Sequence, residues 1–290
     1  MADPHVLLDG LAYVESPRWH EGRLWFAHWG AGEIVAVDLD GRSEVVAHGP
    51  PGLGWSVDHL PDGRLLVSGE RLVVHEPDGT VRPYGALHEI ADHGWNEIAV
   101  ATDGRGGGNI YVNGFGFDFL GGGAPEPGVI ALVTPDERAR IVARDIHFPN
   151  GMVLTPDGRT LIVAESFAGR LTAFDVEPGG KLTNRRVWAD GLAPDGISLD
   201  TEGAIWTGAA GGFDPDGVPV DNAAIRVREG GAVLDRVPVE HSCFATALGG
   251  PDGRTLFLLT AVWRGIEQVD TVLAERTGRI LVATAPAPAA

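Results

Sequence analysis

The chain has 290 residues, and its 22 lysine and arginine side chains face 40 aspartates and glutamates, so its formal net charge is −18. This balance argues against nucleic-acid binding, because no basic surplus is present to neutralise phosphates, and it offers no polybasic attachment to an anionic membrane. A hydrophobic content of 44% with 21% charged residues is typical of a globular protein with a packed core. The single cysteine, Cys243, excludes intrachain disulfides and thiolate metal clusters.

The first residues, MADPHVLLDG, lack the basic and apolar regions of a secretory signal. No apolar run approaches the length of a membrane span. We therefore expect a cytoplasmic protein, a monomer or weak homo-oligomer, whose partner is a small-molecule substrate. No linker divides the chain, so residues 1–290 are predicted to form one domain, with residues 283–290 as an unstructured Ala/Pro tail.

The 42 glycines and 20 prolines are too many for a helix-rich fold, and no sustained 3.6-residue apolar pattern occurs. Short apolar segments instead follow Asp-Gly or Glu-Gly pairs, which are common hairpin-turn signals. These segments are Arg64–Ser68, Asn109–Val112, Thr160–Ala164, Ala204–Thr207 and Thr255–Leu259. The pattern predicts an all-β chain.

The turn glycines recur at similar intervals. They are Gly22, Gly63, Gly104, Gly158, Gly203 and Gly253, separated by 41, 41, 54, 45 and 50 residues. Units of this length match a four-stranded propeller blade, so we predict a six-bladed β-propeller, with a two-sheet sandwich as the alternative. His5–Leu11 would close the ring as the outermost strand of the last blade. Gly121–Gly128 would be a loop insertion in the third blade.

In a propeller, equivalent positions of the blades form a ring around the central axis. The residues eight positions before the turn glycines of units two to six are Trp55, Asn96, Asn150, Asp195 and Ala245. In the first unit the nearest polar residue is Glu15, seven positions before Gly22. Four of the six positions thus carry side-chain oxygen.

Two carboxylates and two carboxamides that converge would be costly to bury without compensation. One divalent cation would balance both negative charges, so Glu15, Asn96, Asn150 and Asp195 are predicted metal ligands. These hard oxygen donors suit Ca²⁺, Mg²⁺ or Mn²⁺, with Zn²⁺ as a further option, and we expect Ca²⁺. Taken singly, Asn150-Gly151 and Asp195-Gly196 would be ordinary turn pairs. The shared position in the repeat favours the metal site.

Three ordered motifs resemble one family. They are Glu15-Ser16-Pro17-Arg18-Trp19, then Pro149-Asn150-Gly151-Met152 with Thr155-Pro156-Asp157-Gly158, then Pro194-Asp195-Gly196-Ile197 with Asp200, Gly203 and Trp206. The chain from about Glu15 to Thr284 is similar to the senescence marker protein, gluconolactonase and luciferin-regenerating enzyme family, with calcium-dependent organophosphate hydrolases as cousins. The resemblance implies a six-bladed propeller with one catalytic divalent cation in its central channel. It also implies that Glu15, Asn150 and Asp195 bind the metal and that Asn96 ligates or flanks it and contacts substrate.

Two positions depart from the family pattern. Sugar-lactonase members typically carry Arg two residues before the third-blade Asn and Asp directly after it, whereas this chain has Gly94 and Glu97. The missing Arg puts an aldonolactone substrate in doubt. Trp95 and the segment Phe115-Gly116-Phe117 favour a more apolar pocket, with packing between blades as the alternative.

The predicted reaction is metal-dependent hydrolysis of a lactone, either sugar-derived or more apolar. The cation would polarise the carbonyl and lower the pKa of bound water, while Asp195 would accept the water's proton. The second strand of each blade returns towards the mouth of the channel, which predicts further substrate contacts there. The strand ends suggest His28, Asn113 and Glu165, and His147 lies just before Pro149-Asn150; for each of these, an ordinary loop or inter-blade hydrogen-bonding role is the alternative. Trp95 and Asn96 are further candidates for substrate contact.

Two other classes of function remain alternatives. The same metal site could serve phosphotriester hydrolysis, or a lyase or isomerase step, because fold and metal do not select the reaction. The chain could also be a non-catalytic propeller used as an interaction platform. That second alternative has no need for four inward oxygen ligands.

Overall fold

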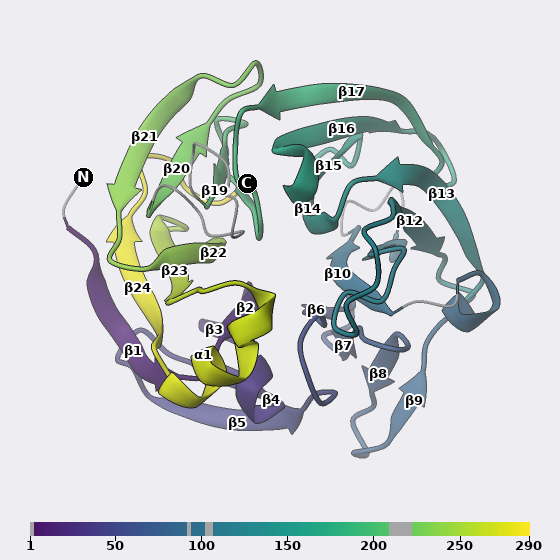
Figure 1. Cartoon of the computed structure of the whole chain (residues 1–290). Helices are drawn as coiled ribbons and strands as arrows, with labels where there is room; N and C mark the ends of the chain where they lie inside the picture. Colours follow the sequence, from purple (N-terminus) through teal and green to yellow (C-terminus); the bar gives the residue numbers. More distant parts are fainter. Residues whose placement is uncertain (1–2, 92–93, 102–106, 209–221) are drawn as a thin grey trace.

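The computed structural model describes residues 3–91, 94–101, 107–208 and 222–290. These residues form six four-stranded antiparallel sheets that lie in a ring around a central axis (Figure 1). The predicted six-bladed β-propeller is therefore confirmed. The third turn glycine, Gly104, lies outside the described residues.

Each sheet begins with its innermost strand and ends at the rim. The first three sheets are β2 (Val14–His20), β3 (Arg23–His28), β4 (Glu33–Val37), β5 (Ser43–His48); β6 (Val57–His59), β7 (Leu65–Val67), β8 (Val73–His75), β9 (Val81–Pro83); and β10 (Trp95–Val100), β11 (Ile110–Gly114), β12 (Gly128–Val133), β13 (Ala139–Ile146). The next two are β14 (Pro149–Leu154), β15 (Thr160–Glu165), β16 (Arg170–Val176), β17 (Leu182–Asp190); and β18 (Ser198–Leu199), β19 (Ile205–Thr207), β20 (Ala223–Val227), β21 (Val233–Pro238).

The last sheet joins the two ends of the chain. It contains β22 (Ser242–Gly249), β23 (Thr255–Ala261), β24 (Gly278–Thr284) and β1 (His5–Leu11). β1 pairs antiparallel with β24, with His5 opposite Val282 and Leu11 opposite Gly278. The ring is closed in the predicted way, by an N-terminal strand at the rim of the last blade.

Hydrophobic clusters fill the space between neighbouring sheets. One cluster joins the first two blades through Ile34 and Trp55, another joins the second and third through Leu66 and Ile98, and the same arrangement continues around the described ring. Because each sheet buries both of its faces against its neighbours, the blades pack face to face around the axis and leave a central channel lined by the innermost strands.

The connections near one end of the channel carry the short helical elements. The helix α1 (Val269–Glu275) lies between β23 and β24, preceded by a 3-10 turn at Ile266–Gln268; the other 3-10 turns are Trp29–Ala31, Leu87–Glu89 and Ser166–Ala168. Residues 121–127 of the predicted insertion lie in the connection between β11 and β12, and its last residue, Gly128, begins β12. No helix in the described part of the chain is long and apolar enough to cross a membrane.

The C-terminal segment corrects one expectation. Residues 283–290 are not an unstructured tail, because β24 extends to Thr284 and the residues beyond it bind the fifth and sixth blades. The Ala289 amide donates to the Gly253 carbonyl at 2.8 Å, and the Ala290 amide donates to the Leu199 carbonyl at 3.1 Å. Backbone hydrogen bonds of this kind need no long side chain, so an Ala/Pro composition does not prevent them.

Candidate active site

The four predicted metal ligands line one cavity of about 590 Å³ at one end of the central channel. Glu15, Asn96 and Asn150 are each the second residue of an innermost strand, β2, β10 and β14. Asp195 lies in the segment before β18. We call these four residues the acidic floor of the cavity.

Local irregularities in the strands aim these side chains. The pairing of β2 with β3 shifts register between Glu15 and Arg18, and β14 with β15 shifts between Pro149 and Met152. β10 shows a shift at the same place, between Trp95 and Ile98. A bulge turns a strand and re-aims a side chain, which explains why three blades present an oxygen-bearing residue at one position.

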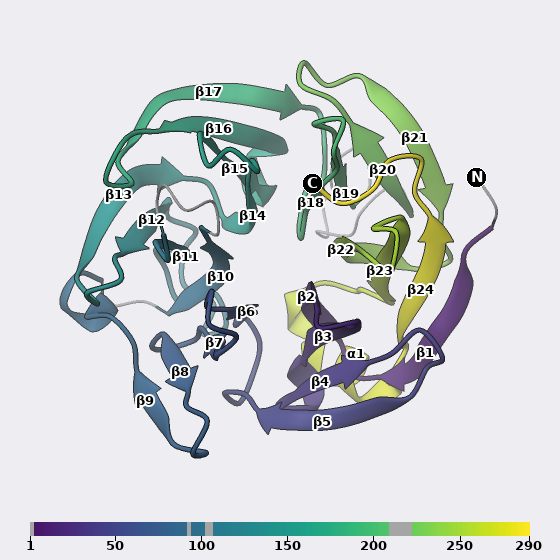
Figure 2. The same cartoon turned by 180° about the vertical axis from the view of Figure 1, so that it is seen from behind.

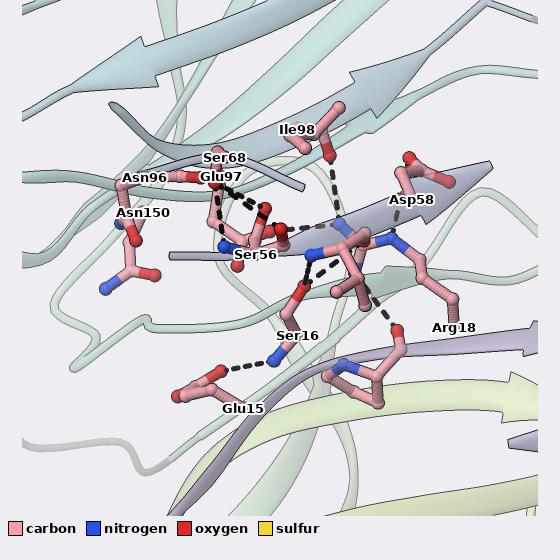
Figure 3. A network of polar contacts seen from close by, with 12 residues as sticks. Glu15, Ser16, Arg18, Ser56, Asp58, Ser68, Asn96, Glu97, Ile98 and Asn150 are labelled. Carbon is pink, nitrogen blue, oxygen red and sulfur yellow. Dashed lines mark hydrogen bonds and ion pairs between the residues drawn. The ribbon is translucent and has the colours of Figure 1, made fainter. Parts of the chain in front are cut away.

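Hydroxyl groups behind the floor tie the inner strands together (Figure 3). The Ser16 hydroxyl accepts a hydrogen bond from the Val57 amide at 2.9 Å and donates to the carbonyl of the same residue at 3.3 Å. The Ser16 amide donates to a carboxylate oxygen of Glu15 at 2.9 Å. These bonds connect the first blade to the second and hold the Glu15 side chain in place.

The carboxamides are oriented by neighbouring groups. The Ser68 hydroxyl donates to the backbone carbonyl of Asn96, and the Asn96 side-chain Nδ2 donates to the Pro149 backbone carbonyl at 3.3 Å. This leaves the Asn96 Oδ1 as the atom available to a cation or substrate. The Asn150 side chain hydrogen bonds to the carboxylate of Asp195.

Without a counter-charge, the Glu15 and Asp195 carboxyl groups of the floor resist ionisation. Burial raises the pKa of Glu15 well above its usual range, and the neighbouring charges of Asp195 and Glu97 raise it further. Burial and the charge of Glu97 raise the pKa of Asp195 to about 8. The charge that opposes Glu97 is Arg18, whose Nη2 lies 3.0 Å from the Glu97 carboxylate.

Arg18 belongs to the other end of the channel. It also faces Asp58, with 3.5 Å between its Nε and a carboxylate oxygen, and it donates to the Ile98 carbonyl at 2.9 Å. Figure 3 shows Arg18 and Asp58 on one side of the network, with Glu15 and Asn150 on the other. The guanidinium therefore supports the floor from behind and is not among the described residues that line the cavity.

The structure does not bring the other candidate substrate contacts to the cavity wall. Asn113 and Trp95 are buried between blades, and His147 is exposed outside the cavity lining. The buried Glu165 carboxylate pairs with Arg170 and Arg185, each at 3.0 Å. Strand ends do return to this end of the ring, but alternate side chains point between blades and not into the channel.

His28 likewise serves the fold. Its Nε2 accepts a hydrogen bond from the Ala12 amide at 2.9 Å, and its Nδ1 lies 3.2 Å from the Glu33 carboxylate. Burial lowers the pKa of the His28 ring. The neutral ring that accepts the Ala12 hydrogen bond anchors the segment that enters β2.

Aromatic residues form much of the cavity, and of these the sequence had pointed only to Phe115, while Trp95 and Phe117 are not among the described lining residues. The described lining residues besides the floor are Tyr13, Trp29, Leu53, Gly54, Phe115, Phe119, Phe148, Ser166, Phe167, Phe244, Trp263, Gly265 and Ile266. Tyr13 and Phe148 each precede a floor residue by two positions and have positive φ angles of 59° and 53°. The repeat comparison, shifted by two positions, would have found both.

The donor chemistry of the floor fits a hard divalent cation. Among the described residues, no three His, Cys, Asp or Glu side chains gather as a metal-binding group, so a cation here would depend on the carboxamides for half of its four predicted ligands. Ca²⁺ accepts such mixed oxygen donors. The carboxylates of the buried Glu15 and the half-buried Asp195 supply the matching negative charge.

Comparison with known proteins gives a consistent picture. The family model described as "SMP-30/Gluconolactonase/LRE-like region" matches residues 13–262. Among curated proteins, the chain is similar to the protein strictosidine synthase-like 6 of Arabidopsis thaliana (28% identical over 176 residues, 59% of this chain and 44% of that protein). It is also similar to the L-arabinolactonase of Azospirillum brasilense (33% over 86 residues, 26% and 28%) and the gluconolactonase of Zymomonas mobilis (30% over 146 residues, 45% and 37%). These matches span less than half the length of each relative.

Solved structures share the whole ring. A protein described as the calcium-binding regucalcin, from Agrobacterium tumefaciens, matches with a TM-score of 0.75 at 20% identity, covering 98% of this chain and 94% of that one. A luciferin-regenerating enzyme matches with a TM-score of 0.76 at 17% identity, covering 99% and 97%. At these identities the likeness shows the fold alone.

Proposed function

Because this chain belongs to the SMP-30/gluconolactonase/LRE-like family, we propose that it is a divalent-metal-dependent hydrolase that opens the ring of a lactone. Its distant similarity to curated sugar lactonases supports hydrolysis of a cyclic ester. The observation that carries the proposal is the acidic floor, where the two carboxylates and two carboxamides face one cavity.

Each residue of the floor has a role in this reaction. Glu15, Asn96, Asn150 and Asp195 would hold the cation. When bound, that ion supplies Lewis acidity for the ester carbonyl and lowers the pKa of water. Asp195 would accept the proton of the attacking water, with its carboxylate oriented by the hydrogen bond from Asn150. The Asn96 Oδ1 would position substrate.

The ring-opening step is balanced by one water molecule. A new bond forms between the water oxygen and the carbonyl carbon, and the ring C–O bond breaks. The ring oxygen takes a proton and becomes a hydroxyl group, while the product carboxyl group releases its proton to solvent. The aromatic residues around the floor would exclude bulk water from the reacting ester and so strengthen the local electrostatic interactions.

The first test is metal-dependent hydrolysis. The metal-stripped protein is mixed with a panel of small lactones, and Ca²⁺, Mg²⁺, Mn²⁺ and Zn²⁺ are added back separately. We expect ring opening to return with one of these ions, most strongly with Ca²⁺. Tight binding of a metal without any lactone hydrolysis would contradict the reaction and direct the search to phosphotriesters and lyase substrates.

Asp195→Asn tests the proposed proton acceptor. We expect kcat to fall by about 10²–10⁴-fold, the usual contribution of a general base, while circular dichroism and the unfolding transition show an intact fold. Asp190→Asn, at an exposed aspartate five residues earlier, is the matched control and should keep wild-type turnover. An Asp195→Asn variant within tenfold of the wild-type kcat would remove the base assignment.

A further inference from the structure

Above the acidic floor, the cavity is enclosed mainly by aromatic rings. Eight of the 17 described lining residues are aromatic, and none of these 17 is lysine, arginine or histidine. The chemistry of this surface determines which substituents, projecting away from the reacting ester, the cavity can bind favourably. The arrangement of the rings indicates which substituents these are.

One side is a phenylalanine wall made of Phe115, Phe119, Phe148 and Phe167. Phe148 lies at its centre, with ring centroids 4.2 Å from Phe167, 4.7 Å from Phe115 and 4.9 Å from Phe119. Phe148 directly precedes β14, and Phe115 directly follows β11. The wall thus belongs to the third and fourth blades, and its rings support one another at contact distance.

The facing side is a tyrosine wall centred on Tyr13. Its ring centroid lies 4.7 Å from that of Phe244 and 5.6 Å from those of Trp29 and Trp263. Tyr13 directly precedes β2, and Phe244 lies in β22. Figure 1 places β2 and β22 across the central axis from β10 and β14, so the two aromatic walls face each other over the channel.

Hydrogen-bonding groups are scarce on these walls. Apart from the floor, the described side chains that carry a hydroxyl are Tyr13 and Ser166. The Ser166 hydroxyl already donates to the Pro194 carbonyl at 2.7 Å. A polyhydroxylated substituent would therefore lose its hydrogen bonds to water and gain few in return, which is costly. An aromatic substituent would lose nothing and would stack on the rings.

Resting on the proposed lactone hydrolysis, we infer that the cavity selects lactones that carry an uncharged aromatic substituent over polyhydroxylated sugar lactones. The ester sits on the acidic floor, and the substituent lies between the phenylalanine wall and the tyrosine wall. The cavity volume of about 590 Å³ is of the size that holds a small drug-like ligand. No lysine, arginine or histidine among the described lining residues could pair with an anionic substituent.

Substitution of Phe167 tests this selectivity without disturbing the hydrophobic core. Its side chain is 55% exposed, and it stacks on Phe148 at the edge of the wall. Leu120 provides the matched control, because it is 51% exposed and adjacent to Phe119 but is not among the described lining residues. Truncating either side chain to alanine leaves the buried clusters between blades intact.

Binding is measured first, by calorimetry with Ca²⁺ present and with two lactams that resist hydrolysis. The probes are a δ-valerolactam with a phenyl group at C6 and the δ-lactam of gluconic acid. We expect the phenyl lactam to bind at least about tenfold more tightly, and Phe167→Ala to reduce its affinity about five- to tenfold while Leu120→Ala keeps the wild-type value. Equal binding of both lactams, tighter binding of the sugar lactam, or no binding of either overturns the inference.

Hydrolysis of the corresponding lactones separates this inference from the function on which it rests. We expect kcat/KM for the phenyl lactone to exceed that for gluconolactone. Phe167→Ala should lower kcat/KM for the phenyl lactone by a larger factor than it lowers that for unsubstituted δ-valerolactone, while Leu120→Ala, outside the described lining, should leave both values unchanged. If the protein prefers the phenyl lactam but opens no lactone, the inferred ligand class is supported and the proposed lactonase activity is refuted. If the protein opens gluconolactone faster than the phenyl lactone, the proposed lactonase activity is supported and the inferred ligand class is refuted.

Discussion

Asn113 does not line the cavity, yet its side chain joins the strands that carry two floor residues. Its Oδ1 accepts a hydrogen bond from the Glu97 amide at 3.1 Å, and its Nδ2 donates to the Asn150 carbonyl at 2.7 Å. The side chain is fully buried. It therefore acts on the site through the backbone of β10 and β14, and we assign it as a positioning residue instead of the substrate contact that the sequence predicted.

Asn113→Leu should weaken the proposed binding of calcium and should also lower the stability of the fold. The substitution leaves one buried amide and one buried carbonyl without their partner, each at a cost of about 1–3 kcal/mol, and it releases the Asn150 backbone. Calorimetric titration with Ca²⁺ and urea unfolding measure the two effects. Asn222→Leu, at an exposed asparagine, should change neither, and unaltered calcium affinity in Asn113→Leu would contradict the positioning role.

At the scale of strands, the innermost strands approach one another so closely that certain positions admit only glycine. A Cβ atom on Gly196 would lie 2.5 Å from the Cβ of Ala245 in β22, and one on Gly151 would lie 2.6 Å from the Ile197 amide nitrogen. These two glycines follow Asp195 and Asn150. The Asn-Gly and Asp-Gly pairs therefore reflect close contact between blades, where the glycine brings the preceding floor residue to the axis.

Gly196→Ala should push the Asp195 segment away from β22. We expect overpacking to cost about 1–3 kcal/mol and calcium affinity to fall about tenfold, because the displaced Asp195 no longer meets the other three floor residues. Gly107→Ala is the control, since a Cβ at Gly107 would have nothing within 4 Å. Thermal unfolding and calcium titration of both variants provide the measurement, and identical behaviour of the two would refute the steric argument.

The contact between β2 and β6 makes stability depend on pH. The His59 ring stacks on His20 with 3.7 Å between centroids, and its Nε2 is buried with no hydrogen-bond partner among the described residues. Burial, followed by the nearby charges of His20 and Arg18, lowers the pKa of His59 from 6.5 to about 3. The unfolded chain therefore binds a proton between these pH values that the folded chain does not, so stability is lost as pH falls from about 6.5 towards 3.

His59→Phe should reduce that loss. The variant keeps a ring for the stack but removes the titrating group, so its urea midpoint should fall less steeply than that of the wild type between pH 6.5 and 4. Above pH 7 the two curves should run parallel. Equal slopes below pH 6.5 would show that His59 does not contribute to the acid sensitivity.

At the scale of the whole molecule, the two ends of the central channel differ in chemistry. One end holds the acidic floor and the aromatic walls, while the other holds a cavity of about 450 Å³ lined in part by Arg18, Asp58 and the C-terminal Ala289 and Ala290. Figure 2 shows the C-terminal segment at this second end, near the axis. The segment joins the fifth and sixth blades at the end of the ring remote from the proposed chemistry.

Removal of residues 286–290 should therefore lower stability without lowering activity. The deletion removes the hydrogen bonds of the Ala289 and Ala290 amides and the bond from the Thr201 amide to the Pro288 carbonyl, a combined loss of roughly 2–4 kcal/mol. We expect a lower unfolding temperature with turnover at 25 °C unchanged. An unchanged unfolding temperature would mean that the segment does not help to hold the ring together.

Much of the fold could be predicted because the turn pairs and their regular spacing are local, repeated sequence patterns. The turn pairs predicted strands that the structure contains, such as β15 and β23, and the predicted closing strand matches β1 (His5–Leu11). The repeat comparison also selected four side chains that meet in one cavity. It missed α1, because a helix of seven residues is too short to show a periodic apolar pattern.

The sequence by itself determined the number and order of the blades, the closure of the ring and the four oxygen-bearing residues at its axis, because a repeat fixes equivalent positions by symmetry. Apart from Phe115, only the tertiary structure decided which side chains surround them. Glu165 and Asn113 turn between blades, while Phe148 and Trp263, 115 residues apart, both face the channel. Whether a side chain points into the channel or between blades depends on strand bulges, on left-handed backbone conformations and on packing between neighbouring blades. No local sequence pattern predicts these features.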